Sequence, residues 1–160
     1  MRSVFFFLFS ILLILPLYTH SQNQIGGDID GEAATNNSGT SVSFSADGKR
    51  IAIGAPNNSN GSGHVRVYEE IDNIWIKVGN DIDGFPEENA GDAVALSADG
   101  KRVIVGAPAY NCSGCNGFAR IYEEIGGDWS QVGGILIGED DDDSFGKAVS
   151  ISADGSRIVI

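Results

Sequence analysis

Polar and apolar residues alternate over residues 41–45, and the same alternation returns at residues 93–97 and 148–152. Strict alternation predicts a β-strand with two unlike faces. Each copy continues with Ser-Ala-Asp-Gly, a tight-turn sequence in which a glycine such as Gly48 is free to take positive φ. A nearly unbroken apolar run follows, which predicts a strand covered on both faces. The first run, at residues 50–55, ends at Pro56, which has no N–H for a sheet.

Two further strands complete each copy. Residues 64–69 and 74–78 flank a hairpin turn at Asp72-Asn73, and residues 118–123 and 128–132 flank one at Gly126-Gly127. The Ser-Ala-Asp-Gly turns begin at positions 45, 97 and 152, so the period is 52 and then 55 residues. Four antiparallel strands in a repeat of this length are typical of a β-propeller blade. An extended β array and a β-sandwich are the alternatives.

We therefore expect an all-β protein built of propeller blades with four antiparallel strands, in an incomplete ring. Residues 24–31 match residues 77–84, so they are interpreted as a strand four that lacks strands one to three before it. On this interpretation the sequence is the N-terminal fragment of a longer propeller. The expected parts are a signal peptide at 1–21, a lone outer strand and acidic loop at 22–37, one blade at 38–89, a second at 90–144, and the truncated start of a third at 145–160.

The first residues have the pattern of a secretory signal. A basic Arg2 precedes an apolar run at residues 4–17, and the small residues Thr19 and Ser21 precede a cleavage point before Gln22. An uncleaved membrane anchor is the alternative, although the run is short for a spanning helix of about 20 residues. We expect a secreted or cell-surface protein with no membrane association after cleavage.

Composition narrows the choice of partners. The chain has 22 acidic and 10 basic residues, a net charge of −12, which argues against nucleic acid as a partner. It has no Gly-x-Ser-x-Gly, His-Glu-x-x-His or phosphate-loop motif, so we expect no catalytic residue and no obligatory cofactor. We therefore predict that the protein is not an enzyme.

Acidic loops are the main chemical feature, and their oxygen ligands could hold Ca²⁺. The alternative is that these loops are simply solvated. The calcium candidates are Asp28, Asp30, Glu32, Asp81, Asp83, Asp140 and Asp142.

Five other residues draw attention. Cys112 and Cys115 lie in a loop whose counterpart in the first copy has no cysteine, and in a secreted chain they predict a local disulfide. A redox pair or half of a zinc site is the alternative. His64 is interpreted as an edge residue at the start of strand three, because its counterpart is Phe118. The recurring Trp75 and Trp129 are predicted to be packing residues.

Three short motifs carry a family resemblance. Gly54-Ala55-Pro56 recurs as Gly106-Ala107-Pro108, and Phe145-Gly146 precedes the third alternating strand. The sequence thereby resembles the FG-GAP repeat of the integrin α-chain propeller. The Ser-x-Asp-Gly-Lys-Arg turn is also similar to that of TolB-type propellers.

The FG-GAP resemblance implies a secreted, non-catalytic binding or adhesion module, with a protein or carbohydrate ligand on the face formed by the acidic loops. The alternative is a polysaccharide-active propeller enzyme whose catalytic residues lie in further blades. Calcium-binding members of the family carry an Asp-x-Asp-x-Asp-Gly loop where this chain has only Ser-Ala-Asp-Gly. Since one carboxylate cannot supply the six to eight oxygens that Ca²⁺ takes, the family's calcium site is not carried over, and Asp47, Asp99 and Asp154 are interpreted as turn residues.

Overall fold

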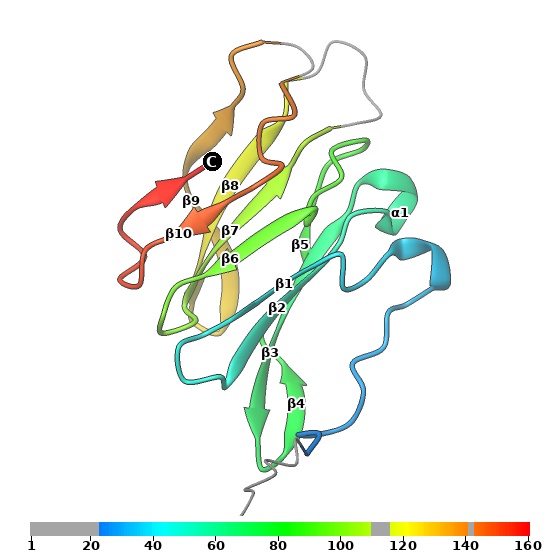
Figure 1. Cartoon of the computed structure of the whole chain (residues 1–160), viewed down its shortest axis with the longest axis vertical. Helices are drawn as coiled ribbons and strands as arrows, with labels where there is room; N and C mark the ends of the chain where they lie inside the picture. The colour runs from blue at the N-terminus through cyan, green and yellow to red at the C-terminus, as the bar shows by residue number, and fades with distance from the viewer. Residues whose placement is uncertain (1–22, 110–115, 141–142) are drawn as a thin grey trace, which may run out of the picture.

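The computed structural model describes residues 23–109, 116–140 and 143–160 (Figure 1). The expected signal peptide, the cysteine pair Cys112 and Cys115, and the calcium candidate Asp142 lie outside these ranges. Within them no helix is long and apolar enough to cross a membrane.

The chain forms antiparallel sheets, which confirms the all-β class. The first sheet has the order β1-β2-β3-β4, with β5 also paired to β3; its strands are β1 (Ser41–Phe44), β2 (Arg50–Ala55), β3 (His64–Ile71), β4 (Ile74–Lys77) and β5 (Ile82–Asp83). The second sheet is β6 (Ala93–Leu96), β7 (Arg102–Ala107), β8 (Phe118–Ile125) and β9 (Asp128–Ile137), in that order. A third, two-stranded sheet pairs β10 (Ser150–Ile151) with β11 (Ile158–Val159). The described helical pieces are the short turns η1 (Ala34–Asn36) and α1 (Asn58–Gly61).

The turns take the conformations that their residues favour. Asp72 and Asn73 have φ of 53° and 63°, which a two-residue hairpin of type I′ requires at both positions. Gly48 has φ of 71° in the turn between β1 and β2. In that turn the Ser45 hydroxyl donates to Asp47 Oδ1 at 2.6 Å, and the Lys49 N–H donates to the same oxygen at 3.0 Å. The aspartate of the turn is therefore a turn residue, as predicted.

The residues that follow strand four are arranged differently in the two large sheets. In the second sheet they continue as part of β9, which pairs with β8 along its whole length apart from a register shift between Ala119 and Ile121. In the first sheet the chain leaves β4 at Lys77 and returns to β3 only as β5, where Asp83 lies opposite His64. Pairing beyond strand four was not predicted in either copy.

Residues 24–31 form no strand in this structure, and their interpretation as a strand four of a longer propeller stays a prediction. A strand needs a backbone partner, but the carbonyl of Ile25 instead accepts a hydrogen bond from the Trp75 indole at 3.1 Å. In the second sheet the Trp129 indole makes the matching bond to the Val78 carbonyl at 3.0 Å. The carbonyl of Ile25 therefore meets the tryptophan of the first sheet as the carbonyl of Val78 meets that of the second.

Consecutive sheets meet along their first strands. Strand β1 contacts β6, and β6 contacts β10, so these three strands lie side by side (Figure 1). Two backbone bonds cross the two seams, from the Ala46 N–H to the Ala98 carbonyl and from the Ala98 N–H to the Ala153 carbonyl, each 2.9 Å long.

The glycine of each Gly-Ala-Pro motif lies directly at these seams. A Cβ at Gly54 would lie 2.0 Å from the Gly91 carbonyl oxygen, and a Cβ at Gly106 would lie 1.9 Å from that of Gly146. Such distances are far inside van der Waals contact. Any side chain at either position would therefore push two neighbouring sheets apart.

The core fills the space between the first two sheets. It includes Val65 and Val67 of β3 and Val103 of β7, all with no exposed surface. Leu96 on β6 is 7% exposed, whereas its counterpart Phe44 on β1 is 55% exposed. One face of the second sheet is thus covered by the first sheet, while the equivalent face of the first sheet is open.

Candidate functional site

A polar cluster lies where β3 begins and β5 ends. Because side chains alternate along a strand, His64 and Arg66 share one face of β3. The return of the chain as β5 places Asp83 opposite His64 and brings Asp81, just before β5, beside Arg66. The site therefore depends on the excursion between β4 and β5, which the second sheet lacks.

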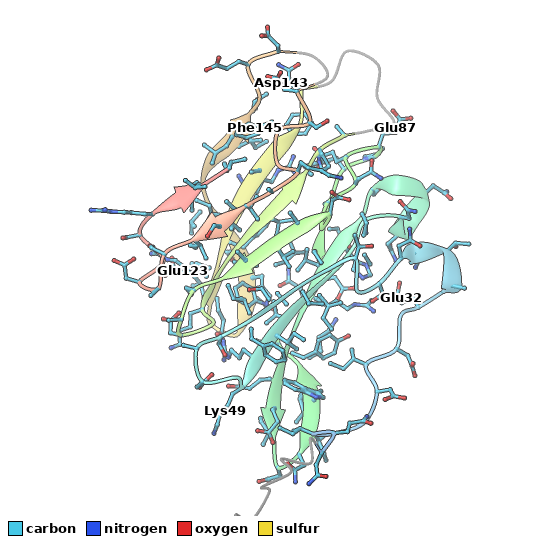
Figure 2. All side chains as sticks on the ribbon, in the orientation of Figure 1. Glu32, Lys49, Glu87, Glu123, Asp143 and Phe145 are labelled. Carbon is cyan, nitrogen blue, oxygen red and sulfur yellow. The ribbon has the colours of Figure 1, made fainter. Side chains whose placement is uncertain are left out.

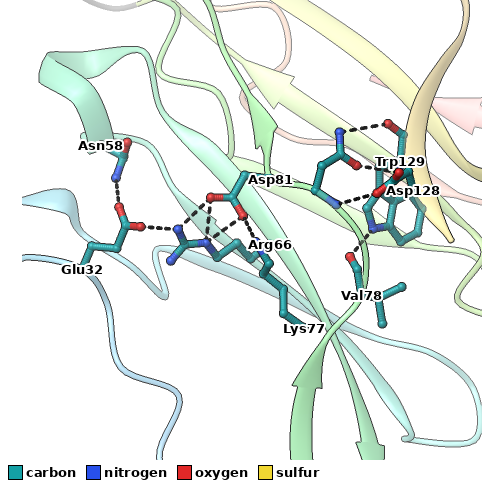
Figure 3. A network of polar contacts seen from close by, with 9 residues as sticks. Glu32, Asn58, Arg66, Lys77, Val78, Asp81, Asp128 and Trp129 are labelled. Carbon is teal, nitrogen blue, oxygen red and sulfur yellow. Dashed lines mark hydrogen bonds and ion pairs between the residues drawn. The ribbon is translucent and has the colours of Figure 1, made fainter.

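Arg66 is the centre of a network of ion pairs (Figure 3). Its Nε lies 3.0 and 3.1 Å from the two Asp81 carboxylate oxygens, and its Nη2 lies 2.7 Å from Oδ2. Nη2 also contacts Glu32, whose other oxygen accepts a hydrogen bond from Asn58 Nδ2 at 2.9 Å. Lys77 Nζ reaches Asp81 Oδ1 at 2.7 Å. Two calcium candidates, Glu32 and Asp81, are therefore engaged by cationic side chains.

These contacts fix the charges of the network. Hydrogen bonds from Arg66, and then from Lys77, hold the pKa of Asp81 at about 2, well below its usual range. The hydrogen bond from Arg66 also lowers the pKa of Glu32. In return, the hydrogen bond to Asp81, and then the one to Glu32, raises the pKa of Arg66. Glu32, Asp81 and Arg66 are therefore charged at neutral pH.

Beside this network is a possible ligand set for a metal ion. His64, Asp81 and Asp83 each offer a ligand atom, and these atoms lie within 4.8 Å of one another. Burial lowers the pKa of His64, so its imidazole is neutral at pH 7 and has a free lone pair. No other such group of three His, Cys, Asp or Glu side chains occurs among the described residues.

The other calcium candidates do not join this cluster. Asp28 accepts a hydrogen bond from Gln24 at 2.8 Å, and Asp30 is exposed on the segment before the first sheet. The backbone N–H of Asp140 bonds to the Asp143 carboxylate at 3.1 Å, in the loop after β9. The structure therefore brings together Glu32, Asp81 and Asp83 and leaves the remaining described candidates elsewhere.

One acidic loop residue has a structural role that its sequence context did not reveal. Glu88 is buried and binds Arg120 of β8 through two contacts of 2.6 and 2.7 Å. The Arg120 guanidinium also lies over the rings of Phe85 and Phe118, 5.1 and 5.7 Å from their centroids. Glu88 is therefore neither solvated nor available to a ligand.

Sequence reasoning missed the importance of His64. The residue begins β3 as expected, but it is only 5% exposed because β2 and β5 flank it on both sides. The sequence held a usable signal: all three residues of the set are replaced together in the second copy, by Phe118, Ile135 and Ile137.

A second polar network joins the two large sheets. The Asn80 side chain accepts a hydrogen bond from the Trp129 N–H at 2.8 Å, and the Asn80 N–H donates to Asp128 Oδ1 at 3.1 Å (Figure 3). Trp129 is 4% exposed and packs in the core, which agrees with its predicted role.

Comparison with known proteins gives little guidance. No family model matches the sequence, and no curated protein matches it. Among solved structures, the chain is similar to hydrazine synthase from Kuenenia stuttgartiensis, with a TM-score of 0.44 and 19% sequence identity. The match covers 74% of this chain and 28% of that chain. A likeness of this degree says nothing about activity.

Proposed function

We propose that the chain forms part of an FG-GAP-type β-propeller that acts outside the cell as a non-catalytic binding or adhesion module. The observation that carries the proposal is the repeated glycine contact between sheets. Gly54 with Gly91, and Gly106 with Gly146, place the Gly-Ala-Pro glycine of one copy against the glycine that precedes strand one of the next. A single packing rule that recurs at successive seams is what a propeller requires of its blades.

The open face of the first sheet supports the same architecture. Val42 is 56% exposed and Phe44 55%, whereas Val94 and Leu96 at the equivalent positions are 8% and 7% exposed. A further repeat unit of the same kind would cover this face as the first sheet covers the second. The exposed side chains are thus blade-contact residues in the proposed propeller.

Charge and loop placement favour a ligand at one edge. In each large sheet the loop before strand one and the loop after strand two lie at the same edge, because a backbone hydrogen bond joins them. The Asn57 N–H bonds to the Asn36 carbonyl at 3.2 Å, and the Ala109 N–H bonds to the Glu88 carbonyl at 3.0 Å. Glu87 lies at this edge, whereas Lys49 lies near the opposite, hairpin edge (Figure 2). Exposed carboxylates suit a ligand with cationic groups or hydroxyls, so a protein or a carbohydrate is the proposed partner.

The architecture is tested by the state of association of the full chain. We expect an oligomer in analytical ultracentrifugation, because the open face of the first sheet would be buried between copies. Phe44→Lys should return a monomer, and Ile125→Lys should not, because Ile125 is equally exposed, at 57%, but lies at a hairpin tip. A wild-type monomer with one sharp unfolding transition would contradict the proposal.

The binding role is tested on two immobilised polysaccharides, cationic chitosan and neutral dextran. We expect at least one of the two matrices to retain the full chain, and we expect no release of reducing sugar from either. Glu87→Lys should weaken retention, whereas Glu70→Lys, at the hairpin edge, should not. Retention that is equal in both variants would show that the acidic edge is not the binding surface, and release of reducing sugar would favour an enzyme.

A further inference from the structure

We propose that His64, Asp81 and Asp83 form a binding site for a divalent transition metal, with Zn²⁺ as the ion that the ligand set fits best. The site lies between β3 and β5 of the first sheet. The site is separate from the turn between strands one and two, where the FG-GAP resemblance would place a calcium loop. The proposal does not depend on the proposed binding function.

The position of His64 suits a metal ligand. The residue is 5% exposed overall, but its ring nitrogens are not fully buried without a partner, as Arg120 Nε is among the described residues. The His64 ring lies within reach of two carboxylates, and a neutral imidazole is the commonest protein ligand of transition metals.

The second sheet serves as an internal control. His64, Asp81 and Asp83 correspond to Phe118, Ile135 and Ile137 by strand register and repeat spacing. Residues between and beside them keep their character: Arg66 corresponds to Arg120, and Ile82 to Leu136. The repeat therefore folds without the polar trio, so the trio is not required by the scaffold.

The geometry favours zinc over calcium. One nitrogen and two carboxylates are too few oxygens for Ca²⁺, which takes six to eight, but they match the three protein ligands of an open zinc site. With metal–ligand bonds of about 2.1 Å, a tetrahedral site needs ligand atoms about 3.4 Å apart. The observed spacing of up to 4.8 Å therefore requires a contraction, and exposed Asp83 is free to supply it.

Lys77 is the competitor for this site. Its Nζ lies 2.7 Å from Asp81 Oδ1, and its side chain is 42% exposed. A metal ion bound to Oδ1 would displace the ammonium group into solvent and replace the Arg66 Nε contact with that oxygen, and it would leave the Arg66 contacts with Oδ2 in place. The residue at the equivalent position of the second sheet is Gln131, which gives a matched substitution.

The test is isothermal titration of the full chain with Zn²⁺, with Cys112→Ser and Cys115→Ser in every variant so that thiols do not contribute. We expect one ion per chain. His64→Phe and Asp83→Ile, which install the residues of the second sheet, should each weaken binding at least about tenfold, the range seen when a metal's surroundings are disrupted. Lys77→Gln should strengthen binding, and Ca²⁺ should give no comparable heat.

Two controls keep the outcome decisive. Far-ultraviolet circular dichroism checks that each variant keeps its strands, and Asp140→Asn removes an acidic side chain that lies elsewhere. Co²⁺ added to the parent protein should give the visible absorption of a low-symmetry site, and His64→Phe should abolish it. Wild-type protein that binds no Zn²⁺, or that binds it equally well after His64→Phe, would overturn the proposal.

Discussion

The first and second sheets are two copies of one repeat, and they differ in which residues and faces they expose. In both, the second and third strands pair in the same register, with Ile51 opposite Tyr68 and Val103 opposite Tyr122. In the first sheet, however, His64, Asp81 and Asp83 gather at the start of the third strand and one face is open. In the second, the three equivalent residues are apolar and the face is covered. The shared residues define the scaffold, and the others are free to carry chemistry.

The strand-three arginine shows how much freedom the repeat allows. Arg66 is held by Asp81 and Glu32, whereas Arg120 is held by Glu88 alone among the ion pairs of the described residues. In both sheets one carboxylate comes from the loop that leads into the first strand. The scaffold thus requires a buried or half-buried arginine with a carboxylate partner but does not fix the position of that partner.

The largest difference between the sheets should appear when these carboxylates are neutralised. In the Arg120–Glu88 pair the side chains are only 5% and 9% exposed, so Glu88→Gln should leave a buried guanidinium uncompensated. Such a loss costs about 3–5 kcal/mol in unfolding free energy. Glu32→Gln should cost far less, because Arg66 keeps Asp81. Urea unfolding compares the two, and equal losses would show that the pairs are equivalent after all.

Next in size is the glycine at the seam. Gly106→Ala should lower the unfolding free energy by about 3 kcal/mol, the upper part of the usual range for overpacking, because a carbonyl of the next sheet occupies the space of the new methyl group. Gly134→Ala is the control, since no atom lies within 4 Å of its Cβ position. It should stay within about 0.5 kcal/mol of wild type. Thermal unfolding measures both variants. Equal losses of stability would show that the glycine contact at the seam is not needed.

A smaller effect should distinguish the covered face from the open one. Leu96→Ala should cost about 2–3 kcal/mol, because it opens a cavity in the core between the sheets. Phe44→Ala, at the equivalent position, should cost less than about 1 kcal/mol in the monomer. Guanidinium unfolding at low protein concentration measures both, and a Phe44 loss as large as that of Leu96 would mean that the first sheet is also covered.

The smallest effect concerns the turn aspartates at low pH. The Ser97 hydroxyl and the Lys101 N–H lower the pKa of Asp99, and the Ser152 hydroxyl and the Ser156 N–H hold that of Asp154 at about 2. A depressed folded-state pKa gives stability that is present above the unfolded value of about 3.9 and is lost as pH falls toward 2. Asp99→Asn should therefore flatten the loss of stability between about pH 4 and pH 2. An unchanged acid profile would show that this turn is not coupled to folding.

The sequence allowed much of the fold to be predicted because its signals are local. The apolar run of β2 was predicted at the residues where it occurs, and the hairpin at Asp72 and Asn73 follows from residues that tolerate positive φ. The glycine turns and the aspartates in them also behave as predicted. In each case a few adjacent residues determine the backbone.

The parts that were not predicted depend on residues far apart in the chain. The burial of Glu88 arises from Arg120, 32 residues away, and the polar network at Arg66 joins Glu32 to it across 34 residues. Residues 24–31 resemble residues 77–84 in sequence, but whether they form a strand is decided by the backbone available beside them. The candidate ligand set at His64 is likewise assembled by the return of β5 to β3, although its joint replacement in the second copy marks the three residues in the sequence.

The two tryptophan contacts can each be followed by fluorescence. Trp129 is buried, and its indole binds a carbonyl of the first sheet, so its emission reports whether the two sheets stay together. Trp75 is half-buried and binds the carbonyl of Ile25, so its emission reports whether residues 24–31 stay docked. The chain has two tryptophans, and each reports a different contact. Replacing one tryptophan with phenylalanine would leave a single fluorophore, whose emission would report when the contact of the remaining tryptophan opens.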